Sequence, residues 1–367
     1  MKTSHLLFFL LILSPLFGQV GKDAEAQSTV QQAIEKIYNF EFDAADQLIA
    51  KLKPKYGQHP VVPLLLSMRL KWQFLPMAAK TPVAVQYQQT LNLCINNAKK
   101  LLTNPNTKSE GTFFLLAAHG YIALAHNYNN ETLKAAGESR KAYGYLSDSF
   151  GFMDQNDEFL FTTGMYNYYI EQYPEDHPMV RPLMLFFKNG DKALGLRQLD
   201  AALKKATYTR WEACSFLRHI YVKHETRFDK AQYYAKLLAD KFPDNSVYLM
   251  QYIESLVLDG RFGEAVPLQA KFKKNATGFY ASGWHLFEGL INEKMDKNDA
   301  RAAENYNMVL KYPVVEALTR EYHALAFAGL ARIAARKNEP QKAKMFTNKC
   351  LALAEYQSTI RSARLSL

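Results

Sequence analysis

Apolar residues recur at three- and four-residue spacing along almost the whole chain, while the strict alternation of a half-buried strand is rare. A spacing of three and four places apolar side chains on one face of an α-helix. Pro and Gly residues fall between the periodic segments, where they end helices. The pattern therefore predicts an all-α protein, with helices at 28–38, 42–53, 60–73, 81–103, 109–127, 131–150, 156–172, 190–205, 208–224, 228–241, 245–258, 262–273, 280–294, 299–311, 315–335 and 339–357.

A repeat of 34 residues is clearest in the centre of the chain. The tetrapeptide Phe228–Ala231 recurs as Phe262–Ala265, so that an aromatic residue stands three positions before an alanine at the start of a helix. A period near 34 residues is typical of stacked helix pairs, which bury their apolar faces only against neighbouring pairs. Less complete copies of the pattern occur at Phe42 and Ala45, at Ala302 and Tyr306, and at Phe327, Leu330, Ala331, Ala334 and Ala343.

This pattern resembles the tetratricopeptide repeat (TPR), in which the small residue lets the two helices of a pair cross closely. Pro243, 12 residues after Ala231, stands where the second helix of that repeat usually ends. The resemblance implies a TPR-like α-solenoid, a right-handed superhelical array of about eight antiparallel helix pairs. It also implies that the first helix of each pair lines a concave groove.

A middle block is less regular. The glycine-aromatic segment Gly164–Tyr169 leads through Pro174, Pro178 and Pro182 into the segment Gly190–Leu196. This order resembles, over some 60 residues, a part of the eukaryotic outer-membrane and lipid-droplet-associated TPR proteins linked to inclusion-body clearance. Three prolines in nine positions prevent a continuous helix.

The chain is therefore predicted to have three parts after its amino terminus. Residues 19–173 are expected to form amino-terminal helical repeats and residues 190–367 carboxy-terminal TPR-like repeats. The proline-broken stretch 174–189 is expected to bridge them.

Residues 1–18 have the pattern of a secretory signal peptide. Lys2 is followed by the apolar run Leu6–Leu13 and then by Pro15 and Gly18. Cleavage after Gly18 is preferred, and cleavage after Ala26 is the alternative. The apolar run is shorter than the ~20 residues needed to span a membrane, and no cysteine follows it for a lipoprotein anchor. We expect a soluble protein exported to the periplasm or cell envelope.

Positive charge is concentrated in the carboxy-terminal part of the chain. The chain carries a formal net charge of +10, and the part from Arg301 to Leu367 has 11 Lys and Arg against five Glu and no Asp. An anionic partner such as lipid head groups, acidic glycans or a carboxylate-bearing peptide fits this end, although a solvated basic face is the simpler reading. The three cysteines, Cys94, Cys214 and Cys350, lie in separate predicted helices, so we expect small buried hydrophobes rather than disulfides.

Motifs for catalysis are missing from the sequence, with no Gly-rich phosphate loop, no Gly-x-Ser-x-Gly and no His-Glu-x-x-His. His219 and His224 are five residues apart, which turns them about 140° from each other on a helix and disfavours a shared metal. Glu171, Glu175 and Asp176 lie beside His177 and could serve a paired-acid hydrolase, or form a solvated loop. We predict no metal and no cofactor.

Candidate binding residues follow from the TPR register. The register set by Ala343 places Arg332 and Arg336 on the inner face, side by side on one helix turn. The same projection turns His219, Lys223 and Glu254 inward. Some members of the family clamp a terminal carboxylate with basic pairs, which implies a carboxylate-presenting ligand at the arginines; two idle surface arginines are the alternative.

An aromatic stripe is a second candidate surface. Tyr166, Tyr169 and Tyr173 share one helix face and could stack on sugar rings or on proline-rich peptide. A stripe of this kind also occurs as core between packed helices, and the sequence leaves both interpretations open.

The sequence thus predicts a non-enzymatic TPR-type scaffold or adaptor that binds a protein or peptide, possibly acidic, in the cell envelope. The alternatives are a glycan- or lipid-binding envelope protein and a hydrolase on an α/α scaffold. Export argues against a nucleic-acid partner, whatever the net charge.

Overall fold

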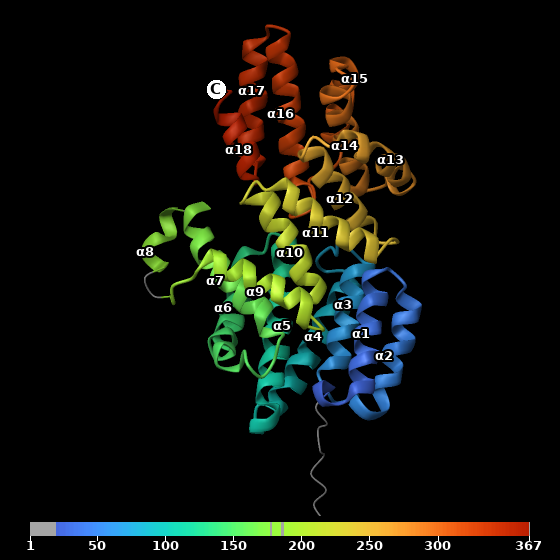
Figure 1. The fold of residues 1–367 in the computed structure, drawn as a ribbon, viewed down its shortest axis with the longest axis vertical. Coiled ribbons are helices and arrows are strands. Elements are labelled where there is room, and N and C mark those ends of the chain that lie inside the picture. The colour runs from blue at the N-terminus through green and yellow to red at the C-terminus, as the bar shows by residue number, and fades with distance from the viewer. Residues whose placement is uncertain (1–19, 177, 185–186, 367) are drawn as a thin grey trace, which may run out of the picture.

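The computed structural model describes residues 20–176, 178–184 and 187–366, which form helices joined by turns and loops, with no β-strand among them (Figure 1). This confirms the predicted all-α class. The helices are α1 (Ala24–Tyr38), α2 (Phe42–Tyr56), α3 (Val61–Gln73), α4 (Pro82–Leu101), α5 (Pro105–Tyr128), α6 (Thr132–Ser149), α7 (Phe159–Asp176), α8 (Arg181–Met184), α9 (Lys192–Lys205), α10 (Arg210–Lys223), α11 (Phe228–Lys241), α12 (Ser246–Leu258), α13 (Phe262–Phe272), α14 (Phe279–Lys294), α15 (Asp299–Val309), α16 (Arg320–Arg336), α17 (Pro340–Leu353) and α18 (Gln357–Arg364).

Successive helices pack as antiparallel pairs, and each pair packs against the next. The pairs are α1/α2, α3/α4, α5/α6, α7/α9, α10/α11, α12/α13, α14/α15 and α16/α17. Figure 1 shows the array running from α1–α5 at the bottom to α14–α18 at the top. This is the arrangement of an α-solenoid, in which each pair buries its apolar faces against its neighbours.

One backbone turn recurs between the two helices of a pair. A residue in the left-handed region follows the first helix, and the second helix begins two residues later. This residue is Phe40 (φ 63°), Asn130 (57°), Thr226 (53°), Gly260 (75°), Lys297 (55°) or Asn338 (56°). Six pairs therefore share the same connection although the turn residues differ in type, which supports a structural repeat independently of sequence identity.

A small residue at the fourth position of the second helix is the other shared feature. Ala45, Ala231, Ala265 and Ala302 all stand at this position and are fully buried. A methyl side chain at a helix crossing allows the two helix axes to approach closely. The aromatic-to-alanine step seen in the sequence therefore marks the crossing point in α2, α11 and α13.

The glycines of the middle block take the same place in the pair α7/α9. Gly195 is the fourth residue of α9, and a Cβ atom there would lie 2.7 Å from both the Gly164 carbonyl oxygen and the Tyr168 backbone nitrogen. A Cβ atom on Gly164 would in turn lie 3.0 Å from the Gly195 oxygen. The two helices cross backbone against backbone, which only glycine permits.

The proline-rich stretch lies inside this pair. Helix α7 continues past Pro174 to Asp176, a single 3₁₀ turn covers Pro178–Val180, and α8 follows. Because α7 packs directly on α9, the stretch 174–189 connects the two helices of one pair.

Some predicted helix ends differ from the structure. Pro105 occupies the first turn of α5, and the Asn104 side chain caps it by accepting from the backbone N–H of Asn106, so the helix starts four residues earlier than predicted. The predicted helix 339–357 is wrong at its end, because α17 stops at Leu353 and the chain is extended at Ala354 and Tyr356 before α18.

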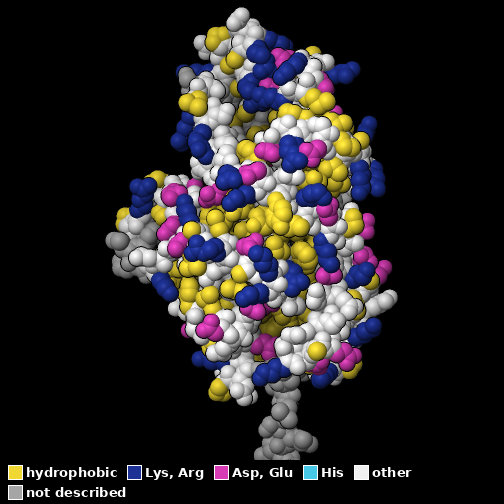
Figure 2. Space-filling view, in the orientation of Figure 1, with side chains coloured by type: hydrophobic (Ala, Val, Ile, Leu, Met, Phe, Trp, Pro, Cys, Tyr) yellow, Lys and Arg dark blue, Asp and Glu magenta, His cyan; other side chains and the backbone are white. Residues whose placement is uncertain are grey.

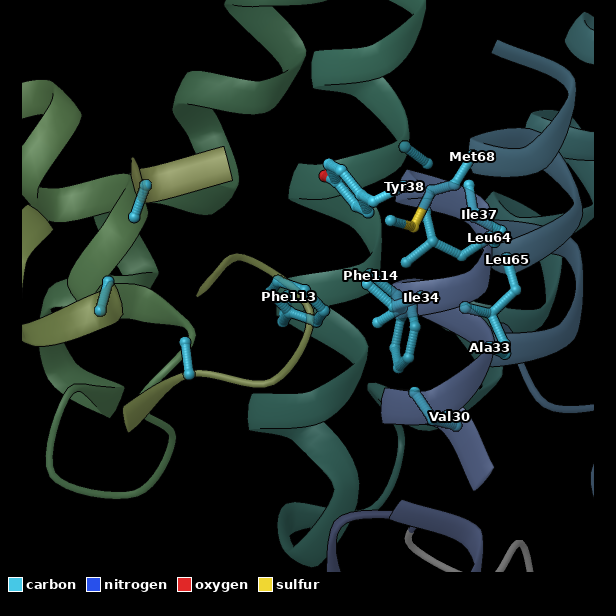
Figure 3. Packing of buried hydrophobic residues seen from close by; sticks show 14 of the residues in the cluster. Val30, Ala33, Ile34, Ile37, Tyr38, Leu64, Leu65, Met68, Phe113 and Phe114 are labelled. Atoms are coloured by element: carbon cyan, nitrogen blue, oxygen red, sulfur yellow. The ribbon is translucent and has the colours of Figure 1, made fainter. Parts of the chain in front are cut away.

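The amino-terminal pairs pack their inner helices onto α10. The side chain of Glu212 in α10 accepts hydrogen bonds from Tyr38 Oη (2.8 Å), Lys71 Nζ (3.2 Å) and Tyr121 Oη (3.3 Å), which come from α1, α3 and α5. Figure 3 shows part of the apolar core beside this cluster, built from α1, α3 and α5. The inner surface of the first three pairs is therefore filled by the chain itself.

Two predictions concern the amino terminus and the cysteines. The predicted signal peptide, residues 1–18, lies outside the described residues. No helix among the described residues is both long and apolar enough to cross a membrane. Cys94, Cys214 and Cys350 are each buried and unpaired, as expected for small apolar side chains.

The left-handed turn residues give a first test. Replacing the exposed Lys297 by glycine should raise the free energy of unfolding by about 0.5–1 kcal/mol, because glycine adopts φ > 0 without a Cβ penalty. Lys344→Gly, at an exposed position within α17, should lower it by about 1 kcal/mol. Urea unfolding followed by circular dichroism measures the free energy of unfolding of both variants. An equal decrease of this free energy in the two variants would refute the shared-turn interpretation.

The glycine crossing gives a second test. Gly195→Ala should destabilise the protein by about 1–3 kcal/mol, because the added Cβ atom meets backbone atoms that cannot rotate away. Gly144→Ala in α6 is the matched control: a Cβ atom there meets nothing within 4 Å, so helix propensity should stabilise it by up to about 1 kcal/mol. Similar melting temperatures for the two variants would contradict the close crossing.

Candidate functional site

The inner groove is the surface formed by α10, α12 and α16 in the carboxy-terminal half. His219 and Glu254, both predicted to face inward, line the same small cavity of about 60 Å³. Arg218 from α10, Glu321 from α16 and Tyr356 from the segment before α18 line it too. The structure thus brings these inward-facing residues together.

A buried ion pair forms the floor of the groove. Glu254 and Arg218 are ion-paired, with side chains only 1% and 4% exposed. Tyr356 Oη donates a 2.6 Å hydrogen bond to Glu254 Oε1. Because removing either partner would leave a buried charge unpaired, this pair holds α10 and α12 in one relative position.

The groove is occupied by the chain's own segment Ala354–Gln357. The backbone N–H groups of Glu355 (2.5 Å) and Tyr356 (3.0 Å) donate to Glu321 Oε2. Gln357 Nε2 donates to Asp176 Oδ1 at 3.0 Å. These contacts explain why α17 ends at Leu353, since a continuous helix would use the same N–H groups internally.

Lys223 and the two histidines lie beside this segment. Lys223 Nζ is 3.8 Å from Glu355 Oε1. Burial, together with Lys223 and Arg218, holds the pKa of His219 well below its usual value. Burial also lowers the pKa of His224 to about 4, although Asp176 lies 3.4 Å away. At neutral pH both imidazoles are therefore neutral, and Lys223 supplies the positive charge here.

Arg332 and Arg336 lie next to each other on α16 and are bound to carboxylates of the chain. Arg332 donates to both oxygens of Glu293, from Nε at 2.9 Å and Nη2 at 2.6 Å. Arg336 donates from Nη2 to Glu293 Oε1 at 3.0 Å, and from Nε (2.9 Å) and Nη2 (2.7 Å) to Asp299. The arginines thus form the bidentate contacts that the sequence suggested, with internal carboxylates as ligands.

The ring of Tyr306 completes this arrangement. Its hydroxyl donates to Glu293 Oε2 at 2.7 Å, and its fully buried ring lies against Gly289 and Gly329. Cβ atoms at those glycines would come within 2.6 and 2.2 Å of the ring. Burial alone would raise the pKa of Glu293, but Arg332 and Tyr306 lower it to about 2.

The tyrosine stripe is divided between core and surface. Tyr166 is buried and donates to the Lys188 carbonyl oxygen at 2.6 Å. Tyr169 is half-buried and packs edge-on against His224, whereas Tyr173 is 49% exposed. The three rings do not form one exposed surface.

The acidic residues at the end of α7, Glu171, Glu175 and Asp176, also bind other side chains and backbone groups of the chain. Lys192 pairs through Nζ with Glu175 at 2.6 Å, and its backbone N–H donates to Glu171 at 3.3 Å. Asp176 accepts from Gln172 and Gln357. His177 lies outside the described residues. Within the described ranges, no group of three or more His, Cys, Asp or Glu side chains is arranged to hold a metal ion.

The chain matches no protein-family model, and the curated proteins contain no significant match to its sequence. The functional argument therefore depends on the geometry of the site.

Sequence reasoning missed three residues of the groove. Glu321 lies 11 residues before Arg332, or three helical turns, so the helical register could have placed both on one side of α16. Glu293 and Tyr356 carry no such signal, because their roles depend on contacts between different helix pairs.

The Glu293 cluster predicts a pH dependence. Because the pKa of Glu293 is below its ordinary value of 4.5 in the folded protein, its contribution to stability is present above about pH 4.5 and is lost as the pH falls through about 2. Glu293→Gln should therefore reduce stability at pH 7 and reduce the loss of stability between pH 5 and pH 2.5. Urea unfolding at a series of pH values measures this.

Glu264→Gln is the control for this variant, because Glu264 in α13 is 52% exposed and pairs only with Arg261 on the surface. It should follow the wild-type pH profile. A Glu293→Gln profile parallel to wild type would contradict the assignment.

Proposed function

We propose that the protein is a non-enzymatic scaffold of the tetratricopeptide type that binds an extended segment of a partner protein along the inner groove. The supporting observation is the segment Ala354–Gln357, which lies in the groove with extended backbone angles at Ala354 (ψ 131°) and Tyr356 (ψ 131°). Its N–H groups bind a carboxylate and its aromatic side chain enters a pocket, as in grooves that hold extended peptides.

Helix α16 continues beyond this segment. Glu321, which holds the segment, and Arg332 lie on the same side of the helix, three turns or about 16 Å apart. At this far end the side chains of Arg332 and Arg336 are 30% and 45% exposed. The chain itself occupies one end of this side of α16, and two partly exposed arginines stand at the other.

The charge of the open end favours an acidic partner. Arg332, Arg336 and Lys294 provide three positive charges, against two negative charges on Glu293 and Asp299. Lys and Arg side chains also gather over the carboxy-terminal helices at the top of Figure 2. An arginine fork that already holds a carboxylate in bidentate geometry is suited to contact another.

Export to the cell envelope is part of the proposal, and the structure bears on where the leader would be cut. Val20 is 1% exposed in the core, and Asp23 caps α1 through the Ala26 N–H (3.1 Å) while binding Lys55 and Tyr56. Cleavage after Ala26 would remove these contacts, whereas cleavage after Gly18 would keep them. The earlier site is therefore the one that we propose.

A pull-down tests the scaffold function. The chain without residues 1–18 serves as bait in envelope extract, with an Arg332→Ala, Arg336→Ala double variant beside it. We expect a protein captured by the wild type to fall at least about fivefold with the double variant, because each charged contact contributes roughly 1 kcal/mol or more. Quantitative mass spectrometry measures the captured amounts.

The matched control is Lys342→Ala, Lys344→Ala, which removes two positive charges from the outer helix α17. It should capture the partner as the wild type does. Because the double arginine variant leaves Glu293 without its cations, its melting temperature must be measured and binding compared below it. Equal capture by all three baits, or no captured protein, would refute the proposal; in the latter case salt-sensitive binding to anionic vesicles or glycans tests the alternative.

A further inference from the structure

A polar pocket of about 530 Å³ opens at the other end of the molecule, away from the inner groove. Its walls come from the start of α1, the first turns of α5, the loop 155–158 before α7 and the loop 205–208 between α9 and α10. A volume of this size lies within the range of small-molecule sites, about 300–1,000 Å³.

One oxygen of a carboxylate in the pocket lacks a hydrogen-bond donor. Glu110 of α5 lines the pocket, and its Oε2 atom is buried without any hydrogen-bond donor. The hydroxyl of Ser109, one residue earlier, is also buried and unpartnered. Buried acceptors without donors cost free energy, so a ligand that brings a donor is stabilised here.

The other oxygen of Glu110 faces a buried histidine. His59 has a side chain only 2% exposed, and its Nδ1 accepts the backbone N–H of Val61 at 3.2 Å. Because Nδ1 is the acceptor, Nε2 carries the proton, and it faces Glu110 Oε1 at 3.4 Å. No Lys or Arg among the described residues is within ion-pair distance of Glu110, so its charge is available.

A second carboxylate of the pocket has a different role. Both oxygens of Glu158 are used by the chain: Oε1 accepts from the N–H groups of Thr207 (2.6 Å) and Tyr208 (3.0 Å), and Oε2 accepts from the N–H (2.9 Å) and hydroxyl (2.7 Å) of Thr209. Glu158 therefore shapes the loop 205–208. The exposed Asp157 lines the pocket as well. Glu110 is therefore the carboxylate of the pocket that keeps a buried oxygen without a donor.

Aromatic rings form the apolar wall. Phe114 of α5 lies next to Ile34 of α1 in Figure 3. The rings of Phe113 and Phe114 both contact that of Tyr208, with centroids 5.3 and 5.5 Å from it. Phe113, Phe114 and Tyr208 all line the pocket. Aromatic ring faces next to a carboxylate favour an organic cation over a neutral or anionic ligand.

The geometry points to a binding site for a small organic cation, an alkylammonium or guanidinium compound, whose charged group pairs with Glu110. The exposed Lys22 and Lys205 stand at the pocket mouth, and Glu110 and Glu158 lie deeper. The charged group of the ligand is therefore directed inward, and its chain lies along the aromatic wall.

Isothermal titration calorimetry with three probes tests the site: agmatine, 1,5-diaminopentane and 1,5-pentanediol, which has the length of the diamine without its charge. We expect at least one cation to bind the full chain and the diol to bind at least about tenfold more weakly. Failure of both cations to bind, or equal binding of the diamine and the diol, would overturn the assignment.

Variants locate the site. Glu110→Gln keeps the size of the side chain and should weaken cation binding about tenfold or more, because it removes the charge that pairs with the ligand. Ser109→Ala is a smaller change and should weaken cation binding by a few-fold. It tests the site independently if Glu110→Gln does not fold. Glu25→Gln, an exposed carboxylate of α1 outside the pocket, should bind as wild type. Cation binding unchanged in Glu110→Gln or in Ser109→Ala would show that the cation binds elsewhere.

Discussion

The close crossing of the two helices in each pair is the constraint on which the rest of the structure depends. In five of the pairs a small buried residue at the fourth position of the second helix sets the distance between the helices. In six pairs a left-handed turn residue two positions before that helix sets their angle. Where alanine would still be too large, as at Gly195 against Gly164, glycine takes the place. Repeating this unit stacks the first helices side by side and creates the inner surface.

That inner surface contains one buried or partly buried glutamate on each of four successive first helices. Glu212, Glu254, Glu293 and Glu321 stand on α10, α12, α14 and α16. The first three each bind a cation and at least one tyrosine hydroxyl, and most of these partners come from other helix pairs. Glu212 binds Lys71, Tyr38 and Tyr121, Glu254 binds Arg218 and Tyr356, and Glu293 binds Arg332 and Tyr306. A buried carboxylate without its donors is costly, so these contacts fix the position of one pair against the next.

This use of charged groups limits what the inner surface offers to a partner. Residues that a helical projection turns inward are largely neutralised by the chain, and His219 and His224 are neutral at physiological pH. The exposed positive charge that remains is at the end of α16. The pocket at Glu110 is the converse case, in which a carboxylate on a first helix has a positioned histidine beside it and no cation.

The sequence by itself determined the helical class, most helix boundaries and the crossing points, because apolar periodicity and small residues at fixed spacing are local properties. It also identified Arg332 and Arg336 as neighbours on one face of a helix. Only the tertiary structure decided that these arginines hold Glu293 and Asp299, and that α17 stops at Leu353 so that Glu355 and Tyr356 donate to Glu321. Those outcomes depend on which side chains of other pairs come within hydrogen-bond distance, and the spacing of residues along one helix contains no information about that distance.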